Sequence, residues 1–160
     1  MAVIYRKITR EDNAAIAKLI KTVFEEFGIA MPGTVYTDPT TDALFELFQK
    51  PQSIYWIAEE EGQIIGGCGI FPTDGLPAGY AELVKFYVST QVRGKGIGNI
   101  LMQKSIESAQ KMGYTHLYLE SFDVLEKAVS LYLRNDFTML QHPLGNSGHY
   151  ACTIWMERGL

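Results

Sequence analysis

The chain has 160 residues, of which 47% are hydrophobic and 20% charged, a balance typical of a single globular domain over residues 1–160. The net charge of −4 and the scattered basic residues argue against a nucleic-acid partner. The first residues carry charges where a secretory signal would have an apolar core, and no apolar run is long enough to cross a bilayer. We therefore expect a cytoplasmic protein without a membrane partner.

The N-terminal segment predicts a strand followed by an amphipathic helix. Residues 3–8 alternate well enough for a strand. Over residues 9–28, Thr9 and Asp12 are of the types that cap the start of a helix, and Gly28 is a residue that ends one. The apolar residues between them share one helical face: Ile16, Leu19, Ile20, Val23, Phe24 and Phe27.

A shorter helix and three strands follow. The helix is expected over residues 38–51, with a buried side made of Leu44, Leu47 and Phe48. Residues 53–60 and 63–71 predict two strands joined by a tight Glu-Gly turn. A further strand is expected over residues 80–88.

The C-terminal half alternates helices with strands. Glycines introduce a long helix over residues 94–112, which precedes a strand at 115–120 and a helix at 123–135. Two last strands are expected at 137–140 and 149–156. The resulting order, βααβββαβαββ, predicts an α/β domain with a mixed central sheet flanked by helices.

The most informative segment is LVKFYVSTQVRGKGIG, residues 83–98, where an apolar strand runs into a glycine-rich turn at the start of a helix. The first amides of a helix have no partner within the helix, and the helix dipole favours an anion there. Glycines at positions 94, 96 and 98 let a phosphate approach the main chain, and Arg93 and Lys95 add positive charge. This pattern indicates a site for a pyrophosphate.

Two other phosphate-binding motifs do not match the residues around these glycines. A P-loop requires Gly-Lys-Ser/Thr, but Asn99 and Ile100 follow Gly98. A dinucleotide-binding fingerprint that begins at Gly94 needs a third glycine where Asn99 stands. The remaining alternative is a turn that only interrupts the helix and leaves its basic side chains in solvent.

The stretch 91–98 resembles the Gln/Arg-x-x-Gly-x-Gly/Ala motif that binds acetyl-CoA in the GNAT superfamily of N-acetyltransferases. It stands between a strand and a helix, as in that family, and the order of elements is similar over nearly the whole chain. Residues 128–137 are similar to the family's late motif, a helix that carries a tyrosine, here Tyr132, before a Gly-Phe pair. Asp136 stands in place of that glycine.

This resemblance implies a GNAT-like fold with acetyl-CoA as cosubstrate. Tyr132 would lie near the sulfur, and the pantetheine arm would be held along the strand by Phe86, Tyr87 and Val88. The pyrophosphate would be bound by the amides of Arg93, Gly94, Lys95, Gly96, Ile97 and Gly98. Gln91 and the side chain of Arg93 would add weaker contacts.

Acetyl transfer to an amine requires a base that leaves the amine neutral and an acid that protonates the departing thiolate. The resemblance implies Tyr132 as the acid, and the alternative role of this residue is core packing. Glu82 is our candidate for the base; its alternative is an exposed residue at a strand start, and Glu120 or a water chain could act instead. Strand alternation predicts that the face of Glu82 also carries Val84, Phe86 and Val88.

The acceptor side is less defined by the sequence. His142 and His149 flank the loop over residues 143–148; both fit structural roles, and His149 also fits the acceptor side. The loop 28–37, which contains Tyr36, is expected to shape the acceptor pocket. The acceptor amine itself stays open between a small molecule, such as a polyamine, an amino acid or an aminoglycoside, and a protein.

Cys68 and Cys152 lie in apolar alternating segments and lack metal-ligand spacing, so we expect buried reduced thiols and no metal site. Neither has a His partner in the sequence, which favours direct transfer in a ternary complex over an acetyl-cysteine intermediate. The alternative to an enzyme is a non-catalytic acyl-CoA-binding regulatory module on the same fold. A homodimer is a reasonable expectation for a small enzyme.

Overall fold

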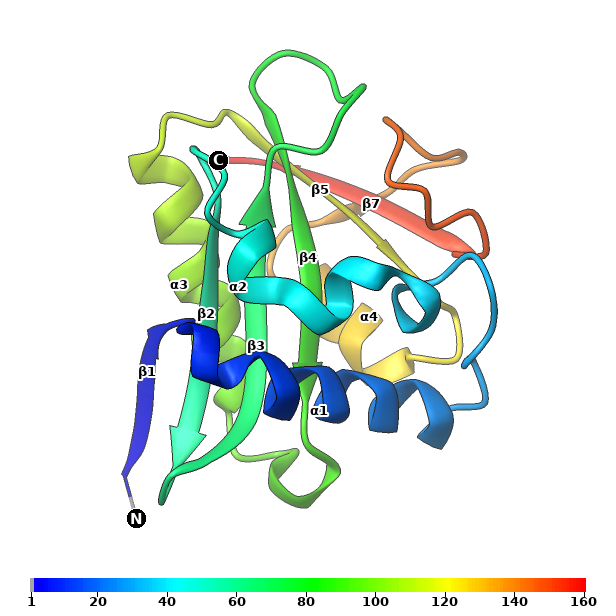
Figure 1. Cartoon of the computed structure of the whole chain (residues 1–160). Helices are drawn as coiled ribbons and strands as arrows, with labels where there is room; N and C mark the ends of the chain where they lie inside the picture. The colour runs from blue at the N-terminus through cyan, green and yellow to red at the C-terminus, as the bar shows by residue number, and fades with distance from the viewer. Residues whose placement is uncertain (1) are drawn as a thin grey trace.

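The computed structural model describes residues 2–160 and contains a seven-stranded mixed sheet (Figure 1). The strands are β1 (Val3–Lys7), β2 (Ile54–Glu60), β3 (Gln63–Phe71), β4 (Tyr80–Val88), β5 (His116–Ser121), β6 (Thr138–Met139) and β7 (Ile154–Gly159). Their order in the sheet is β1-β2-β3-β4-β5-β7-β6, and only β4 and β5 are parallel neighbours. The predicted α/β fold and its order of elements are confirmed.

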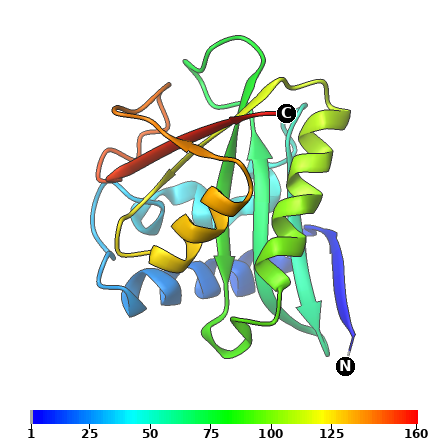
Figure 2. The ribbon, with the colours of Figure 1, turned by 180° about the vertical axis from the view of Figure 1, so that it is seen from behind.

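Helices cover both faces of the sheet (Figures 1 and 2). On one face lie α1 (Asn13–Glu26) and α2 (Leu44–Leu47), and on the other lie α3 (Ile97–Lys111) and α4 (Glu126–Arg134). α2 is shorter than the predicted helix because the 3-10 segment Pro39–Ala43 occupies the residues before it. Among residues 2–160, no helix has the length and apolarity that crossing a bilayer requires.

Each helix layer buries its own apolar core against the sheet. On one side, the predicted stripe of α1 packs against β3 and β4, and the core there includes Ile16, Ile20, Phe24, Tyr55 and Ile57, which are almost fully buried. On the other side, α3 and α4 pack through Leu101, Met102, Ile106 and Tyr132. Because each fully buried large apolar side chain contributes roughly 1.5–3 kcal/mol, these two cores hold the helices on the sheet.

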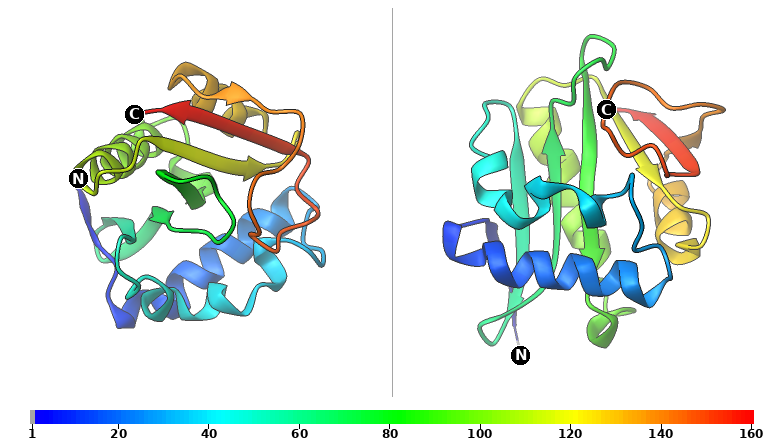
Figure 3. Two further views of the ribbon diagram at one scale, coloured as in Figure 1. Left: turned by 90° about the horizontal axis from the view of Figure 1, so that it is seen from above. Right: turned by 45° about the vertical axis from the view of Figure 1, so that its right-hand side comes forward.

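The parallel strands β4 and β5 stay together for only a short distance. They pair through Tyr80–His116, Ala81–Leu117 and Glu82–Tyr118. Beyond Glu82 the two strands diverge, while β5 remains paired with β7 to its end (Figure 3). The sheet therefore opens toward the carboxyl ends of its two central strands, where ligands bind in many open α/β sheets.

A β-bulge interrupts β4 at Lys85. Tyr87 pairs with Gly67 of β3, and Val84 pairs with Gly69, so β4 has one more residue than β3 in this interval. Lys85 has a φ of 51°, in the left-handed region that bulges use. The bulge thus shifts the side-chain alternation of β4 by one residue.

This shift changes which residues share a face of β4. Before the bulge, Val84 packs into the core on the α1 side, and Glu82 shares that face. After the bulge, Phe86 and Val88 pack into the core on the α3 side. The prediction that Glu82 lies on the same face as Phe86 and Val88 is therefore wrong, because uninterrupted alternation was assumed.

The turn after α4 keeps a glycine-type geometry without a glycine. The amide of Phe137 donates to the carbonyl of Tyr132 at 3.1 Å, and that of Asp136 donates to the carbonyl of Leu133 at 3.3 Å. These two bonds define a Schellman motif, in which Asp136 takes the left-handed position with a φ of 69°. The rings of Tyr132 and Phe137 pack with centroids 5.9 Å apart, so the motif fixes the position of Tyr132.

The last strand begins later than predicted. β7 spans Ile154–Gly159, whereas the sequence indicated residues 149–156. The segment before it turns toward the α1 side of the molecule, where the amide of Ala151 donates to the carbonyl of Gly33 at 3.0 Å. The apolar character of Ala151 and Cys152 reflects burial against that core, so Cys152 lies in a loop and not in a strand.

Candidate active site

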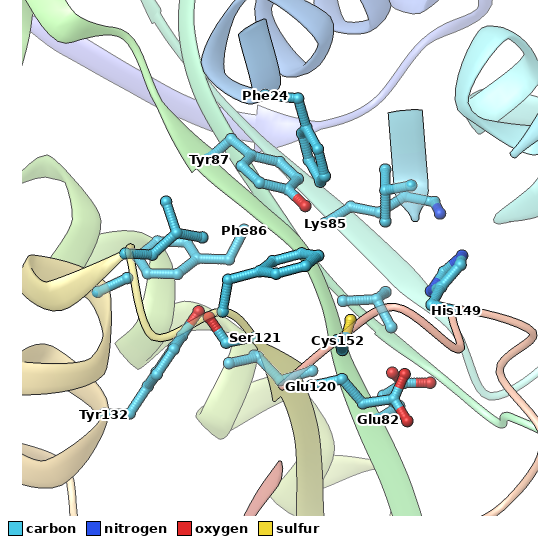
Figure 4. A pocket seen from close by; sticks show the side chains of 16 residues that line it. Phe24, Glu82, Lys85, Phe86, Tyr87, Glu120, Ser121, Tyr132, His149 and Cys152 are labelled. Atoms are coloured by element: carbon cyan, nitrogen blue, oxygen red, sulfur yellow. The ribbon is translucent and has the colours of Figure 1, made fainter. Parts of the chain in front are cut away.

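A pocket lies where β4 and β5 diverge (Figure 4). Its apolar lining includes Phe24, Val35, Phe86, Phe122 and Leu125. Its polar side chains include those of Glu82, Lys85, Glu120, Tyr132, His149 and Cys152. The structure thus brings together the predicted acid, both candidate carboxylates and one of the two histidines.

Glu82 is a buried carboxyl in the wall of this pocket, with only 4% of the residue exposed. The hydroxyl of Thr73 donates to its Oε1 at 2.6 Å. Burial, with a smaller effect from the charge of Glu120, raises the pKa of Glu82 to about 8, although Thr73 and Lys85 act in the opposite direction. Glu82 can therefore gain and lose a proton near neutral pH, as a general base must.

Glu120 lies at the same end of the pocket as Glu82 (Figure 4). The Tyr118 hydroxyl donates to Glu120 Oε2 at 2.7 Å, and the Ser147 hydroxyl donates to Oε1. The amide of Leu144 donates to the Tyr118 hydroxyl at 3.0 Å. Because both of its carboxylate oxygens are engaged, Glu120 anchors the loop before β7 and is less suited than Glu82 to proton transfer.

Tyr132 approaches the pocket from α4, and only 5% of the residue is exposed. Its ring packs against Phe86, with centroids 5.9 Å apart, and its hydroxyl points into the pocket toward Ser121 (Figure 4). Burial raises the pKa of Tyr132 well above that of a free tyrosine. The phenol is therefore protonated at neutral pH and available as a proton donor.

The glycine turn before α3 has the open geometry that a phosphate needs. Gly94 and Gly96 have φ values of 85° and 79°, and a Cβ added to either would meet no atom within 4 Å. No side chain caps the start of α3. The unpaired amides of its first turn can therefore bind an anion, so these residues fit the pyrophosphate of a coenzyme A thioester.

Other residues of the turn have structural contacts of their own. A Cβ on Gly98 would come within 3.2 Å of Phe86, so this glycine allows α3 to pack closely on β4. Arg93 donates to Glu26 Oε2 at 2.6 Å and to the Val88 carbonyl at 3.1 Å, which ties the turn to α1 and β4. Two further side chains are exposed, those of Gln91 and Lys95. Side-chain contacts of Arg93 and Gln91 with a cosubstrate stay predictions.

Comparison with known families identifies the chain. The model of the acetyltransferase (GNAT) family matches residues 16–137. The chain belongs to this family. The N-acetyltransferase YjgM of Escherichia coli (strain K12), itself described as uncharacterized, is 37% identical over 158 residues, which cover 98% of this chain and 95% of that protein. This GNAT protein is therefore an N-acetyltransferase.

Solved structures share the fold of this GNAT enzyme. A GNAT-family acetyltransferase from Staphylococcus aureus Mu50 aligns with a TM-score of 0.88 and 19% identity, over 99% of each chain. The PaiA N-acetyltransferase from Thermoplasma acidophilum, solved in complex with coenzyme A, aligns with a TM-score of 0.75 and 18% identity, over 100% of each chain. At these identities the likeness concerns the fold alone.

The site of this GNAT enzyme also contains an ion pair between Asp38 and Lys85, which the sequence did not single out as site residues. His149 Nε2 lies 2.8 Å from Asp38 Oδ2, and Lys85 Nζ lies 3.8 Å from the same oxygen. Burial alone would raise the pKa of Asp38, but hydrogen bonds from His149 and Thr40 and the charge of Lys85 bring it well below its usual range. No local pattern marks Lys85, because a lysine in an alternating strand normally faces solvent.

The loops beside the pocket occupy different positions relative to it. Val35 lines the pocket, and Gly33, Thr34 and Thr37 line an adjoining hollow together with Asp38 and His149. Tyr36, which the sequence placed near the acceptor, and His142, for which it favoured a structural role, lie outside both. The hydroxyl of Tyr36 donates to Glu25 at 2.7 Å, and His142 is exposed at the surface.

The two cysteines of the GNAT enzyme are free thiols. Burial raises the pKa of each to about 12. Cys68 is fully buried, whereas Cys152 is partly exposed in the pocket. Within residues 2–160, no group of three or more His, Cys, Asp or Glu side chains is arranged to hold a metal ion.

Proposed function

We propose that this GNAT enzyme transfers an acetyl group from acetyl-CoA to a primary amine by direct attack in a ternary complex. The observation that carries the proposal is the pocket between β4 and β5. It combines a buried carboxyl that titrates near neutral pH, Glu82, with a protonated phenol, Tyr132. A base and an acid of this kind are what amine acylation by a thioester requires.

The donor is inferred from the glycine turn and from the family. The open amides between Arg93 and Gly98 suit a pyrophosphate, and the turn begins just after the end of β4. From there a pantetheine arm would follow β4 past Val88, Tyr87 and Phe86 toward Tyr132. The coenzyme A complex of the Thermoplasma acidophilum neighbour supports a coenzyme A thioester, and the family description supports acetyl as the group transferred.

The proton transfers follow from these positions. Glu82 takes one proton from the acceptor ammonium, directly or through water, which leaves a nucleophilic amine. The nitrogen attacks the thioester carbonyl, a C–N bond forms, and the C–S bond breaks. Tyr132 gives its proton to the departing thiolate and regains one from the acylated nitrogen. The products are an amide, free coenzyme A and one proton released through Glu82.

Direct transfer is favoured over a covalent acetyl-cysteine. A cysteine nucleophile reacts as the thiolate, and burial keeps both thiols protonated at neutral pH. Among residues 2–160, the His149 ring contacts Asp38 and no hydrogen bond joins it to the Cys152 thiol, so no imidazole is placed to activate that thiol. The homodimer and the cytoplasmic location stay predictions from the sequence.

The test is thiol release from acetyl-CoA with a panel of polyamines, amino acids, aminoglycosides and peptides. We expect free coenzyme A to appear only when an acceptor amine is present. We also expect reciprocal plots of the initial rate against one substrate, at several fixed concentrations of the other, to intersect. Parallel plots would indicate a covalent acetyl-enzyme. A protein that binds coenzyme A but releases no thiol with any amine would refute the proposed activity.

A further inference from the structure

Lys85 is a buried lysine that faces the pocket; burial lowers the pKa of its amine, and the charges of Asp38 and Glu82 act in the opposite direction. Its side chain is only 4% exposed, because the bulge of β4 directs it inward. An ammonium has three N–H donors, and buried polar groups are normally hydrogen-bonded. The nearest acidic oxygen is Asp38 Oδ2 at 3.8 Å, beyond hydrogen-bond distance. Within residues 2–160, Lys85 Nζ forms no hydrogen bond.

Asp38 is not free to complete the bonding of Lys85. Its Oδ2 lies 2.8 Å from His149 Nε2, and its Oδ1 accepts from the Thr40 amide at 2.9 Å and from the Thr40 hydroxyl at 2.7 Å. These contacts hold the Asp38 carboxylate toward His149 and the loop. The Lys85 ammonium is therefore neutralised in part by charge but left without acceptors for its N–H groups.

We propose that Lys85 binds a carboxylate of the acceptor, so that the acceptor is an amino carboxylate such as a free amino acid. This inference rests on the proposed function. Glu82 and Lys85 lie three positions apart on β4 and line the same pocket. A zwitterionic acceptor would present its carboxylate to the Lys85 ammonium and its ammonium to the ionised form of Glu82, so that each charge gains an opposite partner.

Charge also disfavours the other acceptor classes. A polyamine would place a second cation against Lys85, where no acceptor is free, and like-charge contacts of this kind exclude wrong ligands. A phosphate group would bring two charges close to Glu82 and Glu120, with one lysine to compensate them. The apolar lining, which includes Phe24, Val35 and Leu125, matches an apolar acceptor side chain in polarity.

The experiment compares L-amino acids with their own carboxamides as acceptors. The two members of each pair share shape and amine but differ in the charge that Lys85 would bind. We expect the wild type to use the amino acid about 10- to 100-fold better in kcat/KM, the range for a hydrogen bond to a charged group. The amine of the carboxamide is less basic, so a larger fraction of it is neutral and nucleophilic at neutral pH. Amine reactivity by itself would therefore favour the carboxamide, and a preference for the amino acid has to come from its carboxylate.

Lys85→Met removes the charge and keeps the length of the side chain. We expect this variant to lose the preference for the carboxylate by a similar factor, mainly through the KM of the amino acid. Because the Lys85 charge also lowers the pKa of Glu82, the readout is the ratio of kcat/KM for the two members of a pair, in which a shared change of turnover cancels. Lys18→Met removes an exposed lysine of α1 and is the matched control. A melting curve and coenzyme A affinity establish that each variant is folded.

The outcomes separate this inference from the proposed function. Amino acids and carboxamides used equally well by the wild type overturn the role of Lys85 and leave the acetyltransferase activity intact. If no acceptor releases thiol, the proposed activity fails, and calorimetry on the coenzyme A complex becomes the readout. Binding of an amino acid at least 10-fold tighter than its carboxamide then supports the carboxylate site, and equal or undetectable binding of both overturns it.

Discussion

Replacing Glu82 by glutamine tests whether this carboxyl is perturbed as its burial implies. The folded state raises the pKa of Glu82 from 4.5 to about 8, so between these values the folded protein keeps a proton that the unfolded chain has lost. Stability must then fall as pH rises through this interval, because the folded state binds more protons. Glutamine has nearly the same shape and can still accept the Thr73 hydrogen bond, but it does not ionise.

The size of the effect follows from the two pKa values. Each pH unit between 4.5 and about 8 lowers the free energy of unfolding by about 1.4 kcal/mol, so the total loss reaches at most about 5 kcal/mol. Wild type and Glu82→Gln should have similar stability near pH 5. At pH 9 the variant should be more stable by several kcal/mol. Urea unfolding at half-unit steps of pH measures both curves.

A matched variant and a rate measurement complete this test. Glu107→Gln removes an exposed carboxylate of α3, and surface changes of this kind usually alter stability by less than about 0.5 kcal/mol. The same Glu82→Gln protein should acylate amines roughly 10²-fold more slowly at neutral pH, and part of the rate should return at high pH, where more acceptor is already neutral. Parallel stability curves for wild type and Glu82→Gln from pH 5 to 9 would show that the carboxyl is ionised like a surface residue.

Three further predictions concern the donor site, the acid and the turn after α4. Gly96→Val should weaken coenzyme A binding at least 10-fold in calorimetry and lower the free energy of unfolding by about 1–2 kcal/mol. Gly113→Val, at another open left-handed glycine, should lose about the same stability but keep its affinity for coenzyme A. Tyr132→Phe should lower kcat and kcat/KM together by roughly 10²-fold, with little change in melting temperature or coenzyme A affinity. A variant that turns over as fast as the wild type would show that Tyr132 serves only in core packing. Asp136→Gly should stabilise the protein by about 0.5–1 kcal/mol in urea unfolding, since glycine adopts a φ of 69° without strain; a loss of stability would contradict this account of the turn.

Much of the fold could be predicted because its signals are local. The 3-10 turn Arg10–Asp12 that leads into α1 is one example, since the carboxylate of Asp12 accepts from the Thr9 amide at 2.7 Å, as the spacing of these two residues indicated. The stripe of α1 and the glycine turn before α3 are others. Each depends on residues within a few positions of one another, whose preferred geometry is the same in many folds.

The candidate site could be predicted only in part. Glu82 and Tyr132 were named from the resemblance and lie in one pocket, but alternation placed Glu82 on the wrong face of β4 relative to Phe86. That error arises from the bulge at Lys85, which depends on how β4 pairs with β3. Pairing between strands is a tertiary property, so no periodicity within β4 could reveal the extra residue.

By itself, the sequence determined the class of the fold, the glycine turn before α3 and the chemical types available for acid and base. Only the tertiary structure decided that Asp38, Lys85 and His149, as much as 111 residues apart, meet at one side of the pocket. It also decided which of these groups are buried. Burial sets the pKa of Glu82 and leaves Lys85 without hydrogen-bond partners, and burial depends on the packing of segments that are distant in the chain.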